Sequence, residues 1–154
     1  MIHNQFMKQN IIKKFFFFFP KVLIFLLFLF SSSYAVDSKY FEEGKKLFNK
    51  NEIEKSKVFF EKDIVFNPKS DTSYLYLAKI FNNNKNDVEE EKNLDTVLLI
   101  DPQNHIAIYM LALLKIKQSD YNSAKDLIGK YSLYCKKECS KKDELDKKFD
   151  KLTP

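Results

Sequence analysis

The chain has 154 residues, enough for one domain, and its 26 Lys and Arg residues against 21 acidic residues give a formal charge of +5. All of the basic residues are Lys; four of them, Lys8, Lys13, Lys14 and Lys21, precede residue 36, which leaves 22 Lys against 21 acidic residues afterwards. A nucleic-acid-binding domain usually has a strong basic excess and Arg for phosphate and base contacts. The composition therefore argues against a nucleic-acid partner.

Residues 1–35 have the pattern of a cleavable signal peptide. Two Lys residues precede an apolar run over residues 15–30, and Ser33 and Ala35 occupy the −3 and −1 positions of a small-residue cleavage site. We therefore expect cleavage after Ala35 and export of the remaining chain to the periplasm or the outside of the cell.

An N-terminal segment that stays in the membrane as an anchor is the alternative. Pro20 and Lys21 interrupt the apolar run, and its unbroken part extends only from Val22 to Phe30. A membrane-spanning helix needs roughly 20 apolar residues, so the length favours cleavage. If the segment is not cleaved, we expect it to be the only part of the chain that contacts the membrane.

Two proline motifs, FNP at residues 66–68 and IDP at residues 100–102, have the spacing of a repeat. A period of about 34 residues is typical of a helix–turn–helix unit that stacks into a solenoid, and Pro68 and Pro102 match it. Small residues recur at one place in the first helix of each unit: Gly44, Ala78 and Ala112. Small side chains allow two helices to cross closely, and a proline ends each unit because it cannot continue a helix.

In these positions the chain resembles the tetratricopeptide repeat family. The resemblance implies an all-α fold, an α-solenoid of three repeats at residues 37–70, 71–104 and 105–136. Residues 137–154 would then form a C-terminal capping helix or tail. The further core positions implied for the three units are Tyr40, Leu47, Ser56 and Phe60; Tyr74, Leu77, Phe81 and Leu94; and Ile108, Leu111, Ala124, Ile128 and Tyr131.

Six repeat helices are expected within about 2–4 residues of the following bounds: 38–50, 53–66, 71–82, 88–100, 104–117 and 121–134. Asp71, Asn104 and Asp120 are the expected N-caps of three of them. No segment alternates between apolar and polar residues over a useful length, so no sheet is expected.

The second and third units depart from the pattern. Glu90 stands at the small-residue position of the second unit, and we infer one extra residue in the turn at residues 82–86, which would move Glu91 into that position. Lys136 replaces the terminal proline of the third unit.

The tail has an amphipathic pattern after Cys139. Leu145, Phe149 and Leu152 follow one another at helical spacing among charged residues. A terminal repeat needs a cap with a polar outer face, so we expect these residues to form that cap.

Cys135 and Cys139 are separated by three residues, a spacing that matches neither a thioredoxin-type redox pair nor haem attachment. In an exported protein we expect an intramolecular disulfide, since two Cα atoms at this spacing in a helix lie roughly 6 Å apart. Free thiols and a redox role remain the alternatives.

No catalytic or cofactor-binding motif is present. His105 is the only His after residue 35, which is too few for a zinc site together with two Cys. Gly occurs only at Gly44 and Gly129, so a phosphate-binding glycine loop is excluded. We therefore expect no enzymatic activity, no metal and no cofactor.

In tetratricopeptide repeats the first helix of each unit lines a concave groove in which partners bind. The resemblance implies a groove formed by Phe41, Lys45, Phe48, Leu75, Lys79, Asn82, Asn83, Tyr109, Leu113, Ile116 and Lys117. Apolar groups there could bury side chains of an extended peptide, and Lys and Asn could bind its backbone or a carboxylate. The alternative is that Phe41, Tyr109 and Ile116 only pack against the cap or a neighbouring unit.

The sequence therefore predicts a non-enzymatic protein-protein interaction scaffold of the cell envelope or secreted space, with a protein or peptide partner. A membrane-anchored assembly factor and a redox factor that uses Cys135 and Cys139 are the competing hypotheses.

Overall fold

The structure, a computed structural model, describes residues 38–135 and 139–152. They belong to the second of two compact units, Asp37–Pro154. The predicted signal peptide, Lys136 and the side chain of Leu152 lie outside the described residues. The described residues form α-helices and no strands, and none of these helices is both long and apolar enough to cross a membrane.

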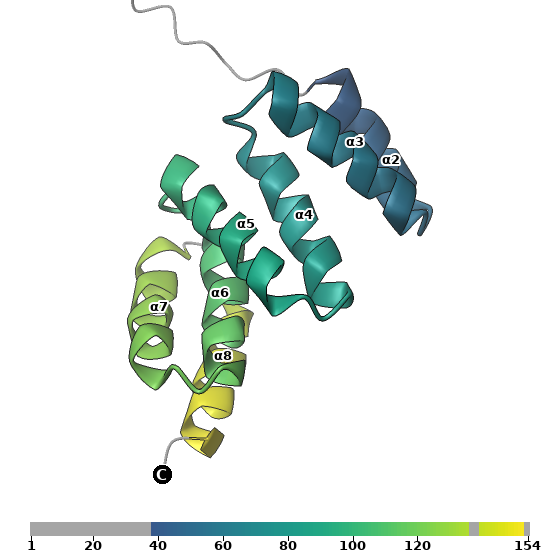
Figure 1. Ribbon diagram of the computed structural model, residues 1–154. Helices are drawn as coiled ribbons and strands as arrows, with labels where there is room; N and C mark the ends of the chain where they lie inside the picture. The colour runs from purple at the N-terminus through teal and green to yellow at the C-terminus, as the bar shows by residue number, and fades with distance from the viewer. Residues whose placement is uncertain (1–37, 136–138, 153–154) are drawn as a thin grey trace, which may run out of the picture. The chain divides into compact units, whose positions relative to one another are not determined.

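The helices form successive hairpins (Figure 1). Their bounds are α2 (Lys39–Asn49), α3 (Ile53–Phe66), α4 (Asp71–Asn83), α5 (Asp87–Ile100), α6 (His105–Lys117), α7 (Tyr121–Tyr134) and α8 (Ser140–Leu152). Helix α2 packs on α3, α4 on α5 and α6 on α7, while α3 contacts α4 and α5 contacts α6. Helix α8 contacts both α6 and α7. The predicted all-α solenoid of three helix pairs with a C-terminal helix is confirmed, and the six repeat helices end within one residue of their predicted bounds.

The turn inside each hairpin has the same geometry in all three units. Asn51, Lys85 and Ser119 have positive φ angles of 61°, 56° and 63°, and each occupies the same place in its unit. Each of these turns leaves three residues between its two helices. The inferred extra residue in the second turn is therefore wrong, and Glu90, rather than Glu91, occupies the small-residue position, where it is 1% exposed.

Short polar side chains begin most of the helices by accepting a hydrogen bond from a backbone N–H of the first turn. Asn104 and Asp120 are N-caps, as predicted, and Asn86 caps α5. The prediction for α4 is wrong by one residue, because the Ser70 side chain accepts the hydrogen bond from the backbone N–H of Ser73 and Asp71 is the first helical residue.

Close crossing of α2 and α3 depends on the missing side chain of Gly44. A Cβ atom at this position would lie 2.8 Å from the ring of Phe60, which is completely buried. Phe60 belongs to a core cluster of the first unit and α4. A second, larger cluster contains Leu94, Leu111 and the completely buried Leu145 of α8. Helix α8 therefore closes the apolar core at the C-terminal end, as predicted for a cap.

Candidate partner-binding groove

The predicted groove residues differ in how far they are exposed. Lys45, Phe48, Lys79, Tyr109 and Leu113 are half-buried, and Asn82, Asn83 and Lys117 are exposed. Phe41, Leu75 and Ile116 are buried, with exposed fractions of 4%, 6% and 5%.

These three buried side chains are packing residues, which corrects the prediction that they line an open groove. The ring of Phe41 lies 6.0 Å from that of Phe60 on α3 and 5.8 Å from that of Tyr76 on α4. Leu75 and Ile116 belong to the larger core cluster. For Phe41 and Ile116 the packing alternative therefore describes the observed environment.

Two polar groove residues are committed to contacts within the repeat. Asn82 donates hydrogen bonds from Nδ2 to both carboxylate oxygens of Glu90, at 2.9 and 3.0 Å. The Nζ of Lys117 lies 2.6 Å from the Oδ1 of Asp87 at the start of α5. Both contacts join a first helix to α5. A partner that binds Asn82 or Lys117 would therefore have to replace a hydrogen bond or ion pair that the side chain already makes.

Lysines stand over aromatic rings on α2 and α4, the first helices of the first two units. The Nζ of Lys45 lies 5.8 Å from the ring centroid of Phe41, and the Nζ of Lys79 lies 4.6 Å from that of Tyr76. An aromatic face attracts a cation, so each ring helps to fix the position of its ammonium group. Tyr76 was missing from the predicted groove, although its place three residues before Lys79 on a helix was a usable signal.

Tyr76 also joins the first unit to the second. Its ring stacks on that of Phe60 at 4.8 Å and meets the ring of Phe48 edge-on at 5.1 Å. Phe48 and Lys79 therefore flank one aromatic surface that includes Tyr76.

The C-terminal helix supplies the groove face of the third unit with polar groups. The hydroxyl of Tyr109 donates a hydrogen bond to Oε2 of Glu144, at 2.8 Å, and the Nζ of Lys141 lies 4.5 Å from the ring centroid of Tyr109. Burial, followed by the hydrogen bond and negative charge of Glu144, raises the pKa of Tyr109 to about 12. The sequence could not place Lys141 and Glu144 here, because only the docking of α8 brings them to α6.

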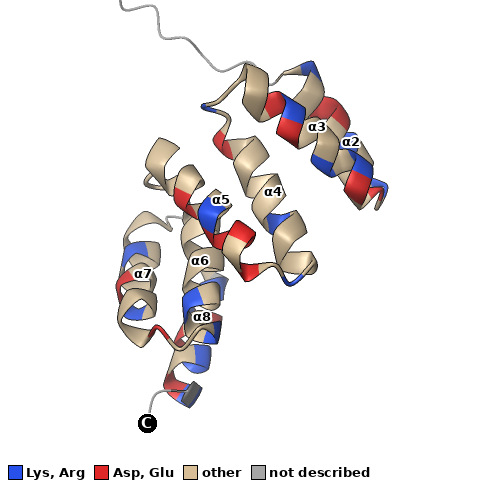
Figure 2. Cartoon of the chain, in the orientation of Figure 1, with Lys and Arg blue, Asp and Glu red and all other residues tan. Residues whose placement is uncertain are grey.

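Positive charge predominates on the exposed side of α2. A hollow of about 370 Å³ opens beside this helix and is lined by Glu42, Lys45, Lys46, Asn49 and Lys50. Figure 2 shows the charged segments along α2 and a basic segment on α4, the helix that contains Lys79. Among the described residues, no group of three or more His, Cys, Asp and Glu side chains is placed to hold a metal ion.

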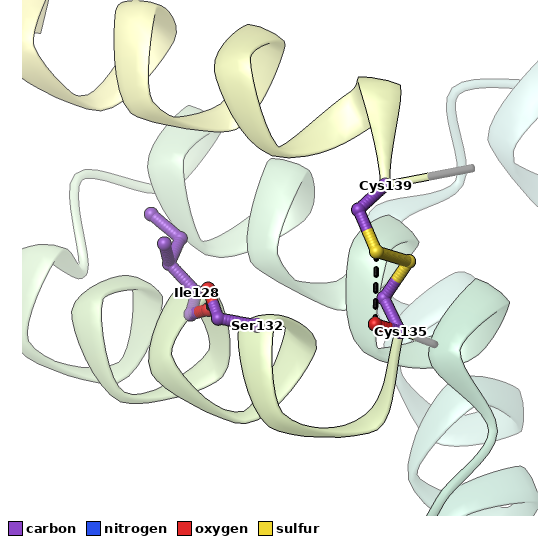
Figure 3. The surroundings of a disulfide bond; sticks show 4 residues. All are labelled: Ile128, Ser132, Cys135 and Cys139. Carbon is purple, nitrogen blue, oxygen red and sulfur yellow. Dashed lines mark hydrogen bonds between the residues drawn. A yellow bond between two sulfur atoms is a disulfide. The ribbon is translucent and has the colours of Figure 1, made fainter. Parts of the chain in front are cut away.

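A disulfide joins the end of α7 to the start of α8 (Figure 3). The Cα atoms of Cys135 and Cys139 lie 5.8 Å apart, close to the helical spacing, although Cys135 is the C-cap of α7 rather than an interior residue. The Sγ of Cys139 lies 2.8 Å from the carbonyl oxygen of Cys135. A disulfide sulfur carries no proton, so this is a close sulfur–oxygen contact. The link sets where α8 begins.

The outer surface of the second helices carries a row of exposed apolar side chains that the sequence pattern did not reveal. Val65, Leu99 and Leu133 are 75%, 84% and 75% exposed, and they occupy the same place in each unit. This outer row is a second surface at which a partner could bind.

No family model and no curated protein matches this chain. Solved structures do. The tetratricopeptide domain of Arabidopsis OM64 is 18% identical, with a TM-score of 0.67 over 74% of this chain and 93% of that domain. The first tetratricopeptide domain of Spaghetti (RPAP3), bound to an HSP90 peptide, is 14% identical, with a TM-score of 0.66 over 73% and 90%.

The TPR2B domain of yeast Sti1, in a pHsp70 complex, is 20% identical, with a TM-score of 0.64 over 75% of this chain and 97% of that domain. At these identities the likeness concerns the fold. Together with the proline period and the repeated turn geometry, it shows that the chain has the tetratricopeptide repeat fold.

Proposed function

We propose that the protein is a non-enzymatic interaction scaffold that binds a protein or an extended peptide in the groove formed by α2, α4 and α6. One observation carries this proposal: Lys45 and Lys79 occupy equivalent places one repeat apart, and each stands over an aromatic ring. Equivalent positions on stacked repeats face the same side of a solenoid, so the two ammonium groups are available to one extended ligand.

The physical basis of binding is a combination of apolar contact and charge. Phe48 and Leu113 are half-buried and offer apolar surface beside the lysines. A carboxylate of the ligand gains charge-assisted hydrogen bonds from a lysine, each worth about 1.5–3 kcal/mol. The ring beneath each lysine restricts the positions of its ammonium group, so the lysine loses less conformational freedom when the ligand docks.

The structural neighbours support a peptide ligand. Spaghetti was solved with the HSP90 peptide SRMEEVD, and the Sti1 domain was solved as a pHsp70 complex. The same fold therefore accommodates a peptide, and at 14–20% identity this likeness concerns the fold and not the individual binding residues.

We further propose that the scaffold acts after export, in the periplasm or outside the cell, because residues 1–35 have the pattern of a cleavable signal peptide. Mass spectrometry of the purified protein tests this proposal. A mature N-terminus at Val36 supports export with cleavage, whereas an intact N-terminus in membrane fractions supports the anchored assembly factor instead.

Site-specific photo-crosslinking tests the binding surface in the cell. We would replace Asn49, which is exposed and lines the hollow beside Lys45, or Leu99 in the outer row with a photoreactive amino acid in the full chain and identify the crosslinked protein by mass spectrometry. We expect one partner to be captured from position 49 and little from position 99. Capture of the same partner from Leu99 alone would place binding on the outer row and refute the groove.

The cysteines give a test of the redox alternative. The double substitution Cys135→Ser and Cys139→Ser should leave crosslinking from position 49 in place if the protein is a scaffold. In the single variant Cys135→Ser, a mixed disulfide between the partner and Cys139 would favour the redox factor.

A further inference from the structure

The C-terminal helix α8 covers Tyr109, one of the predicted groove residues on α6. The carboxylate of Glu144 accepts a hydrogen bond from the hydroxyl of Tyr109, at 2.8 Å, and the Nζ of Lys141 lies 4.5 Å from the centroid of the same ring. Side chains of α8 therefore occupy both the hydroxyl and one face of this tyrosine. A partner that binds Tyr109 would have to displace them.

Few apolar side chains hold α8 in this place. Leu145, Phe149 and Leu152 are the only apolar residues in the sequence of this 13-residue helix. Leu145 is completely buried in the larger core cluster, and the ring of Phe149 meets that of Tyr121 edge-on at 6.2 Å. A helix of this length is marginally stable in water on its own. The docking of α8 therefore depends on a small number of contacts with α6 and α7.

The disulfide ties the two helix ends together. The backbone N–H of Cys135 donates a hydrogen bond to the carbonyl of Tyr131 at the end of α7, and the backbone N–H of Lys142 donates one to the carbonyl of Cys139 at the start of α8, both at 2.9 Å. Each cysteine is thus hydrogen-bonded to a different helix, and their Cα atoms lie 5.8 Å apart. Without the S–S bond the main chain alone joins α7 to α8, and its greater freedom favours the undocked helix.

We propose that the Cys135–Cys139 disulfide is a redox-sensitive switch. The oxidised form keeps α8 docked over Tyr109, and reduction by a dithiol lets α8 leave α6 and α7, which opens the third unit of the groove to the partner. The proposal rests on the groove function above and adds its regulation. The two cysteines act on the position of α8 and perform no chemistry on the partner.

The reduction consumes one dithiol, of a small molecule or of a reductase. Its thiolate attacks the Sγ of Cys139, which is half-buried, whereas Cys135 is only 8% exposed. The S–S bond breaks, and Cys135 leaves as a thiolate that takes up a proton. The second thiol of the dithiol then attacks the mixed disulfide and releases Cys139, which is protonated in turn. Two electrons and two protons pass to the cysteines, and the dithiol becomes a disulfide.

Hydrogen exchange tests the movement of α8 without any partner. The sample is the full chain as the host processes it, before and after reduction with dithiothreitol. We expect the amides of α8 to exchange about threefold to thirtyfold faster after reduction, the upper value being set by the entropy of so short a loop. Exchange in α4 should change less than twofold. Unchanged exchange in α8, or equal acceleration in α4, would overturn the proposal.

The double variant Cys135→Ser and Cys139→Ser is the matched control for the reductant. Its α8 should exchange as fast as that of the reduced wild type, and dithiothreitol should have no further effect. If dithiothreitol still accelerates exchange in this variant, the reductant acts elsewhere and the switch is refuted.

Photo-crosslinking in the cell tests whether the movement opens the groove. A photoreactive amino acid replaces either Ile106, which is 39% exposed and lies one helical turn before Tyr109, or Asn49 of the first unit. Capture of the partner from position 106 should rise at least threefold when the double cysteine variant is compared with the disulfide-linked chain. Capture from position 49 should be the same in both.

The two crosslinking positions separate failure of the switch from failure of the groove function. Equal capture from position 106 in the two forms, with capture from position 49 retained, would refute the switch and leave the groove function standing. Absence of capture from both positions in both forms would refute the groove function, and with it the opening of the groove to a partner.

Discussion

Asn82, near the end of α4, donates hydrogen bonds to both carboxylate oxygens of Glu90 across the turn that leads to α5. Glu90 is 1% exposed and stands where the other units have the small residues Ser56 and Ala124, both completely buried. A buried carboxylate with amide donors is costly when ionised. The pair therefore makes the second hairpin sensitive to pH.

Burial raises the pKa of Glu90 above 4.5, with the hydrogen bond from Asn82 opposing the shift. The folded state then holds this proton more tightly than the unfolded state, so the contribution of Glu90 to stability rises as pH falls through its folded pKa and is lost as pH rises. We expect Glu90→Gln to be at least as stable as the wild type at pH 7, with this advantage shrinking towards pH 5 in urea unfolding.

The neighbouring Glu91 is the control, because its pKa is shifted in the opposite direction. Hydrogen bonds from Lys115 and Gln118 lower its pKa, so its stabilising contribution is present above the unfolded pKa and is lost as pH falls through the folded pKa. Glu91→Gln should therefore be less stable than the wild type at pH 7, and the deficit should shrink in acid. The same pH trend for both variants would contradict the assignment.

The two glycines should respond to alanine in opposite directions. Gly44→Ala places a Cβ 2.8 Å from the Phe60 ring, and overpacking of this kind costs about 1–3 kcal/mol. Gly129, inside α7, has nothing within 4 Å of the added atom, so Gly129→Ala should stabilise by about 0.5–1 kcal/mol through helix propensity. Thermal unfolding followed by circular dichroism checks both, and a stabilising Gly44→Ala would show that α2 and α3 can separate without cost.

The lysines of the groove should affect binding more than folding. Lys45→Glu with Lys79→Glu removes two cation–π contacts of half-buried lysines, each worth about 0.5–2 kcal/mol, so the domain should stay folded with a melting temperature lowered by several degrees. Capture of the partner should fall sharply in a pull-down from envelope extract, because the charge of the groove is reversed. Lys147→Glu, at an exposed position of α8, is the control for a charge reversal away from α2 and α4. Undiminished capture by the double variant would place the binding surface on the outer row or on the cap.

The disulfide should be found in exported protein and should act locally. Mass analysis without reductant should show Cys135 joined to Cys139, whereas two alkylatable thiols would refute this. The closed loop is short, so the chain-entropy contribution is at most about 2 kcal/mol. Hydrogen exchange of α8 in the Cys135→Ser and Cys139→Ser double variant should be faster, while exchange in α4 stays unchanged.

The repeat period, the helix bounds and the C-terminal cap could be predicted from the sequence, because they depend on local chemistry that recurs along the chain. Pro68 and Pro102 end helices wherever they occur, and Gly44, Ala78 and Ala112 mark close crossings that repeat with the units. The sequence assigned the wrong residue to the small-residue position of the second unit. Glu90 and Glu91 were both candidates, because the length of the turn before them is not fixed by the local sequence. Only the structure, with its three equal turns, resolved that choice.

Tertiary structure alone decided which side chains on the first helix of each unit remain exposed to a binding partner. Phe41, Leu75 and Ile116 have the same helical spacing as exposed neighbours, but packing against other helices buries them. Lys141 and Glu144 are distant from Tyr109 along the chain and reach it only because α8 docks on α6 and α7. The sequence by itself determined the repeating unit through short-range hydrogen bonding and sterics, whereas the exposure of the side chains on α2, α4 and α6 arises from contacts between distant residues, whose geometry no local pattern specifies.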